Sequence, residues 1–146
     1  MLGYMVTWTT YGSWLPGDDR GYVSRGKILG KNEALRRANI ERLKSRVVRL
    51  SRQEQEVVRR AILSRAESLR QKIYAIVVRS NHVHIVAQRI SKSIEMVVSY
   101  YKNSARLALR ANGFTGGLWS RGFDKRFCYE HSQLKGRIEY LQGHPE

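Results

Sequence analysis

Two short apolar runs separated by three residues constrain the fold of this chain more than any other feature. Residues 72–78 read "KIYAIVV" and residues 82–88 read "HVHIVAQ", with "RSN" between them. Runs rich in β-branched residues on either side of a short polar turn predict two strands joined as a hairpin. Successive side chains of a strand point to opposite faces, so His82 and His84 share one face. Val83 and Ile85 then face a core on the other side.

The rest of the chain predicts further strands and helices around this hairpin. Turn residues, capping residues and apolar periodicity set their bounds. The expected elements are a strand over 4–10, a loop over 11–27 anchored by Trp14 and Leu15, a helix from Asn32 to Leu50, a helix opened by the capping box of Ser51 and Glu54, the hairpin, a helix within 91–113, a strand within 114–130 and a helix that ends near His144. This order predicts an α+β fold, with a ferredoxin-like or RRM-like antiparallel sheet packed against helices. The sequence shows no repeat or linker, so a single domain over 1–146 is expected.

The charge balance points to a polyanionic partner. The chain has 27 Lys and Arg against 12 Asp and Glu, a formal net charge of +15. Basic residues run along the whole sequence instead of gathering in one amphipathic helix or tail, which argues against a membrane-surface protein. No apolar run reaches the roughly 18 residues of a membrane span and no signal peptide is seen, so a cytoplasmic protein without membrane contact is expected. Cys128 is the single cysteine, which excludes an internal disulfide and a cysteine-based zinc cage, and we expect it in the core.

The last predicted helix adds a possible chemistry to the two histidines. Tyr140 and His144 are four residues apart and therefore share a helix face. If that helix lies beside the histidine strand, three imidazoles and a phenol meet. A phenol is a poor nucleophile at neutral pH, and a divalent ion held by His82, His84 and a third ligand would assist its attack on a phosphodiester.

Each of these residues also has a plainer interpretation. A His-x-His pair occurs often as two hydrogen-bonded histidines in a sheet. Tyr140 is equally compatible with a place in the core. Asn81 either orients a ligand histidine or only forms the hairpin turn.

Four separated motifs resemble the single-tyrosine HUH transposases of the IS200-like superfamily, most closely their REP-associated tyrosine transposase branch. The motifs read "TWTTYGSWLPGDDRG", "NHVHIV", "GGLWSRGFDKRF" and "RIEYLQGHP", in an order that spans nearly the whole chain. The resemblance implies a prokaryotic, nucleoid-associated enzyme. Such an enzyme cleaves and rejoins single-stranded DNA beside a hairpin, through a 5′-phosphotyrosine intermediate and without ATP.

The resemblance also implies roles for individual residues. Tyr140 matches the nucleophile, His82 and His84 match the metal pair, and His144 matches the third ligand, where relatives usually have Asn-Pro in place of His144-Pro145. The implied metal is Mg²⁺ or Mn²⁺, whereas ligand softness alone favours zinc or manganese on three imidazoles. DNA contacts are expected from Arg79, Arg89, Lys102, Arg106, Trp119, Arg121 and Arg126, with a core role as the alternative for Trp119.

We therefore predict a metal-dependent single-stranded DNA endonuclease and strand transferase whose partner is single-stranded or hairpin DNA. Tyr101, and less so Tyr100, are rival nucleophiles, as the resemblance to HUH enzymes implies, because other classes of these enzymes have their tyrosine on a helix that follows the histidines. One alternative is a non-catalytic single-stranded or hairpin nucleic-acid-binding module, such as a degenerate transposase copy. Another is a metal-independent RNA endonuclease on an RRM-like fold, with a histidine as general base. No organic cofactor is expected, and the composition is compatible with a monomer or a homodimer.

Overall fold

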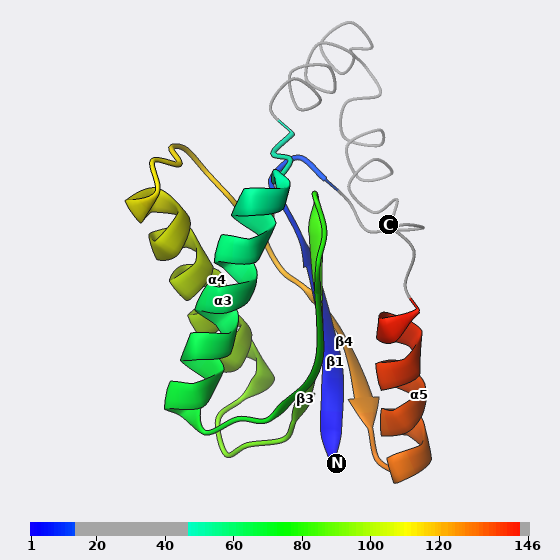
Figure 1. The fold of residues 1–146 in the computed structure, drawn as a ribbon. Helices are drawn as coiled ribbons and strands as arrows, with labels where there is room; N and C mark the ends of the chain where they lie inside the picture. The colour runs from blue at the N-terminus through cyan, green and yellow to red at the C-terminus, as the bar shows by residue number, and fades with distance from the viewer. Residues whose placement is uncertain (14–46, 144–146) are drawn as a thin grey trace, which may run out of the picture.

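The computed structural model describes residues 1–13 and 47–143. Its elements are β1 (Gly3–Thr9), α3 (Arg52–Leu69), β2 (Ile73–Val78), β3 (His82–Gln88), α4 (Ile94–Ala111), β4 (Asp124–Cys128) and α5 (His131–Gln142). Within these residues the strands form one antiparallel sheet in the order β2-β3-β1-β4 (Figure 1). A βαββαβ succession with this strand order is the ferredoxin-like arrangement, so the expected fold class is confirmed.

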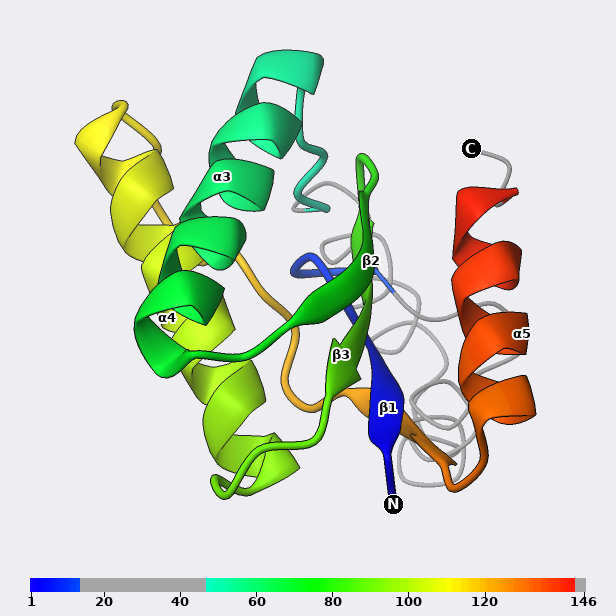
Figure 2. The same ribbon diagram turned by 60° about the horizontal axis from the view of Figure 1, so that its bottom comes forward.

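The sheet separates two helical layers. Helices α3 and α4 cover one face and α5 covers the other (Figures 1 and 2). The larger core lies between the sheet and the α3/α4 layer and includes Trp8, Ile85 and Ile62. A smaller core beneath α5 consists of Met5, Val86, Cys128, Leu134 and Leu141, with partly buried neighbours. Cys128 is thus the buried core residue that the sequence predicts.

Local signals in the sequence account for most element ends. Ser51 and Glu54 form the predicted capping box at the start of α3, where each side chain accepts a hydrogen bond from the other residue's backbone N–H. Ser93 caps α4, and its hydroxyl accepts a hydrogen bond from the Met96 N–H. The predicted hairpin is confirmed as β2 and β3. Helix α5 ends at Gln142, with Gly143 as its C-cap.

The prediction that a helix reaches Leu50 is wrong at its C-terminal end. Residues 47–50 have no regular secondary structure. The Val48 N–H donates to the Tyr11 carbonyl at 2.9 Å, and the Leu50 N–H donates to the Ser80 carbonyl at 2.7 Å. These amides therefore bond to distant segments and not to a helix of their own. The rest of that predicted helix, like the loop residues Trp14 and Leu15, lies outside the described residues.

The helices that the structure describes include no membrane span. None of α3, α4 and α5 is both long enough and apolar enough to cross a bilayer.

Candidate functional site

The two histidines lie together on the face of the sheet that α5 covers. His82 and His84 alternate with Val83 and Ile85 along β3, and Val86, two residues after His84, packs in the core beneath α5. The two imidazole centroids are 4.8 Å apart, and the ring planes are inclined by 73°. His84 is only 9% exposed. The convergence of the two rings that the sequence predicts is therefore present.

Each imidazole is held through its Nδ1 atom. His84 Nδ1 lies 2.8 Å from Thr7 Oγ1, and His82 Nδ1 lies 2.8 Å from Asn81 Oδ1. An amide oxygen only accepts, so Nδ1 of His82 carries the hydrogen and Nε2 carries the lone pair. The same tautomer of His84 lets the Thr7 hydroxyl accept. A histidine that binds a metal through one nitrogen usually donates from the other in this manner.

Asn81 therefore does both things that the sequence left open: it lies in the hairpin turn and it contacts His82. Thr7 was missed by the sequence reading. Its position becomes visible only from the pairing of β1 with β3, which sets Thr7 opposite His84 and Thr9 opposite His82. A threonine in a predicted strand carries no other signal that it will meet a histidine 77 positions away.

Tyr140 belongs to α5 but not to its buried stripe. The stripe consists of Leu134, Ile138 and Leu141, at the spacing of one helix face. Tyr140 lies about a third of a turn from this stripe and is 52% exposed. The alternative of a core tyrosine is therefore wrong.

The direction of α5 brings Tyr140 toward the histidine end of the sheet. The helix begins over the Gly3 end of β1, where a β-carbon at Gly3 would lie 3.2 Å from Leu134 Cδ1. It then runs in the same direction as β1 (Figure 1). Tyr140 is six residues after Leu134, about 9 Å further along the helix axis. Thr7, the partner of His84, lies at that end of β1.

The rival tyrosines lie in the opposite layer. Tyr101 is fully buried on the inner side of α4. Its hydroxyl donates to Gln71 Oε1, and the Gln71 side-chain N–H donates to the Tyr4 hydroxyl at 2.7 Å. Burial raises the pKa of the Tyr101 phenol well above its usual value. Tyr100 packs under the Arg65 guanidinium, 4.7 Å from the ring centroid. Neither phenol is on the histidine face, so both are excluded as partners of these imidazoles.

The third metal ligand that the resemblance implies, His144, lies outside the described residues. Among residues 1–13 and 47–143, no three His, Cys, Asp or Glu side chains come together in a group that could hold a metal. The donors present, two imidazoles with their Nδ1 atoms engaged, fit a divalent ion that accepts nitrogen ligands, such as Mn²⁺, better than Mg²⁺, which prefers oxygen.

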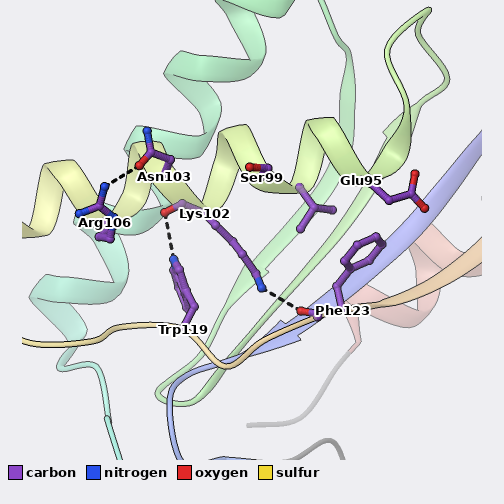
Figure 3. Close-up of a pocket in the computed structure, with 9 residues that line it drawn as sticks. Glu95, Ser99, Lys102, Asn103, Arg106, Trp119 and Phe123 are labelled. Atoms are coloured by element: carbon purple, nitrogen blue, oxygen red, sulfur yellow. Dashed lines mark hydrogen bonds between the residues drawn. The ribbon is translucent and has the colours of Figure 1, made fainter.

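The predicted DNA contacts do not form one surface. Lys102, Arg106 and Trp119 gather beside α4, in the layer opposite α5 (Figure 3). Trp119 also has the anchoring role proposed as its alternative, since its ring packs edge-on against Trp8 at 5.9 Å and its indole N–H donates to the Lys102 carbonyl.

The remaining arginines are scattered. Arg79 precedes the hairpin turn, and its backbone N–H donates to the His82 carbonyl. Arg126 lies on the edge strand β4, where its side chain pairs with Asp124 at 3.0 Å. Arg89 follows the far end of β3, five residues beyond His84, and Arg121 is exposed before β4. Of these four, Arg79 is the nearest in sequence to the histidines.

Comparison with known proteins gives two informative structural neighbours. A protein from Deinococcus radiodurans R1 assigned as a transposase aligns over 99% of this chain and 92% of its own, with a TM-score of 0.55 and 14% identity. A REP-associated tyrosine transposase, solved bound to a REP hairpin, aligns over 96% of this chain and 64% of its own, with a TM-score of 0.58 and 13% identity. At this identity the likeness establishes a shared fold. No protein-family model and no curated protein sequence matches the chain.

Proposed function

We propose that this chain is a metal-dependent single-stranded DNA endonuclease and strand transferase that acts beside DNA hairpins through Tyr140. One observation carries the proposal. The helix that covers the histidine face brings an exposed tyrosine to the end of the sheet where two imidazoles are held through Nδ1. The shared fold with a transposase bound to a REP hairpin supports the choice of DNA as substrate.

The reaction exchanges one phosphodiester for another. The phenol oxygen of Tyr140 forms a bond to phosphorus and gives its proton to solvent. The bond from phosphorus to the 3′ oxygen of the preceding nucleotide breaks, and this oxygen takes a proton from solvent and leaves as a hydroxyl. The product is a 5′-phosphotyrosine, which a second 3′-hydroxyl can attack to rejoin the strand without ATP. A divalent ion on His82, His84 and a third ligand such as His144 would draw charge from the phosphate during attack.

The residues around the histidines prepare this site. Asn81 holds the hydrogen of His82 on Nδ1, and Thr7 engages Nδ1 of His84, so that Nε2 is the nitrogen of each ring that would bind a metal. His84 is held deep in the sheet and His82 lies nearer the surface, at the turn end of the hairpin. The positive charge of the whole chain would bring a polyanionic strand to this face.

The test uses end-labelled hairpin oligonucleotides with random single-stranded flanks, incubated with Mn²⁺ or Mg²⁺ and run on a denaturing gel. We expect a covalent protein-DNA band that EDTA abolishes and that Tyr140→Phe removes. Tyr129→Phe is the matched control, because Tyr129 is 62% exposed and lies two residues before α5 begins. Tyr129→Phe should keep the band at its full intensity.

The other outcomes separate the alternatives. If the protein binds the oligonucleotide pool but no lane contains a covalent band, the protein is a nucleic-acid-binding module and not an enzyme. Cleavage that persists in EDTA and requires a 2′-hydroxyl would show that the protein is an RNA endonuclease. A band that persists in Tyr140→Phe would reject Tyr140 as the nucleophile.

A further inference from the structure

A groove lies beside α4, in the layer opposite the histidine face. It encloses about 410 Å³, is open to solvent, and is formed by one side of α4 and the segment 119–123 that leads into β4 (Figure 3). Its lining residues on α4 are Glu95, Val98, Ser99, Lys102, Asn103 and Arg106, and those on the segment are Trp119, Gly122 and Phe123. A volume of this order suits a small ligand or part of a chain.

The two walls of the groove differ in chemistry. The segment contributes two aromatic side chains, Trp119 and Phe123. The helix contributes hydrogen-bond donors and one carboxylate, Glu95, which is paired with Lys125 at 2.7 Å. Arg106 donates to Asn103 Oδ1 at 2.7 Å, which uses one of its five N–H groups and leaves the Asn103 amide hydrogens directed away from that contact. Aromatic faces beside guanidinium and amide donors are the combination that binds unpaired nucleobases and their phosphates.

Lys102 makes the groove rigid as well as basic. Its ammonium donates to the Ser120 carbonyl at 3.0 Å and to the Gly122 carbonyl at 2.8 Å. The Trp119 indole donates to the Lys102 carbonyl at 3.0 Å (Figure 3). These three bonds tie the aromatic segment to the helix. An ammonium has three hydrogens, so a ligand oxygen can take the third. Partial burial lowers the pKa of Lys102.

The groove is also connected to the histidine site through the sheet. Phe123 lines the groove, and the next residue, Asp124, begins β4. Asp124 pairs with Thr7, and Thr7 pairs with His84 on the other side. Two strand spacings, about 10 Å, therefore separate the start of β4 from His84. A strand in the groove would reach the histidine face after passing around the β4 edge.

From these observations we infer that the groove between α4 and residues 119–123 holds one or two unpaired nucleotides of a single strand. The bases stack on Trp119 and Phe123, while Arg106, Asn103 and Lys102 bind their polar edges and phosphates. This inference rests on the proposed function in that the strand held here is the flank of the one that is cut. It adds a binding site on the layer that contains neither Tyr140 nor the histidines.

The test measures binding apart from cleavage. A fluorescently labelled single-stranded oligonucleotide is titrated in EDTA, and its anisotropy is followed for wild type, Arg106→Gln and Phe123→Leu. We expect each variant to bind about tenfold more weakly, because each removes a stacking or charged contact. Arg110→Gln is the matched control, since Arg110 is exposed one turn further along α4, outside the groove, and has the same charge.

Thermal unfolding of each variant, followed by circular dichroism, checks that the fold is intact. Wild-type affinity in both Arg106→Gln and Phe123→Leu would overturn the groove, as would an equal loss in Arg110→Gln. The covalent-band assay tests the proposed function separately. If the wild type forms the covalent band but the groove variants bind as tightly as the wild type, the proposed enzyme activity stands and the groove inference is wrong. If the groove variants bind more weakly but no covalent band forms, the groove inference stands and the proposed enzyme activity is wrong.

Discussion

The hydroxyl of Thr7 and the Nδ1 atom of His84 lie 2.8 Å apart, across the β1–β3 pair at the centre of the sheet. The contact is buried, since Thr7 is 3% exposed. With the imidazole as donor, the hydroxyl fixes both the plane of the ring and the position of its lone pair. Thr7 thus engages Nδ1 of His84, so that Nε2 is the ring nitrogen directed away from this contact.

If His82 and His84 bind a divalent ion as proposed, replacing this hydroxyl should weaken that binding without unfolding the protein. Thr7→Val keeps the shape of the side chain but removes the oxygen that orients His84, so we expect Mn²⁺ affinity to fall by about 10- to 100-fold. Isothermal titration calorimetry measures the affinity. Thr9→Val is the matched control, because the Thr9 hydroxyl bonds to the Ser13 carbonyl and not to a histidine. Unchanged affinity in Thr7→Val would show that His84 needs no orienting partner.

The sequence predicts well those structural features that depend on residues close together in the chain. The hairpin, the Ser51 capping box and the α4 helix follow from alternation, capping and periodicity over short windows, and the structure confirms them. The failure at residues 47–50 arose because their amides bond to Tyr11 and Ser80, far away in sequence. A helical apolar spacing could not reveal those partners.

The candidate sites divide in the same way. His82 and His84 share a face because of strand geometry alone, which the sequence shows directly. That α5 covers this same face depends on the order of the strands and on helix packing, so the sequence could give it only as a condition. The groove exists only because residues 119–123 lie against α4 in the folded chain, which the sequence does not show. The stripe of Glu95, Ser99, Lys102 and Arg106 at helical spacing was its one visible signal.

Replacement of two glycines by alanine should change the free energy of unfolding in opposite directions. A β-carbon at Gly3 would lie 2.5 Å from the Ala87 carbonyl oxygen on the paired strand, so Gly3→Ala should destabilise the protein by about 1–3 kcal/mol or more. Gly136 lies within α5 with nothing near its missing β-carbon, so Gly136→Ala should stabilise by about 0.5–1 kcal/mol. Urea unfolding curves measure both. Equal shifts of the same sign would contradict the packing around Gly3.

The end of α3 offers a stabilising substitution. Arg70 is the C-cap and adopts the left-handed region, with φ 54° and ψ 38°. This conformation is strained for a residue with a β-carbon, so Arg70→Gly should raise the free energy of unfolding by about 1 kcal/mol. Arg70→Ala keeps the β-carbon and should gain nothing. A gain of the same size in both variants would mean that loss of the arginine charge is responsible.

The buried phenols predict how stability depends on alkaline pH. Burial raises the pKa of both Tyr4 and Tyr101 above the usual value of about 10. Above pH 10 the unfolded chain releases these protons while the folded protein keeps them, so the folded state binds more protons and its stability falls as pH rises. Below that pH the contribution is fully present and constant.

A single variant separates the two phenols. Tyr101→Phe leaves Tyr4 as the only one of the two buried phenols that titrates, so the loss of stability with pH above 10 should become less steep. At neutral pH the same variant should be less stable by about 1–3 kcal/mol, because the buried Gln71 carbonyl loses its donor. Denaturant unfolding between pH 7 and pH 11 measures both effects. If the slopes of wild type and variant coincided, the Tyr101 phenol would ionise in the folded protein as readily as in water, which would contradict its burial.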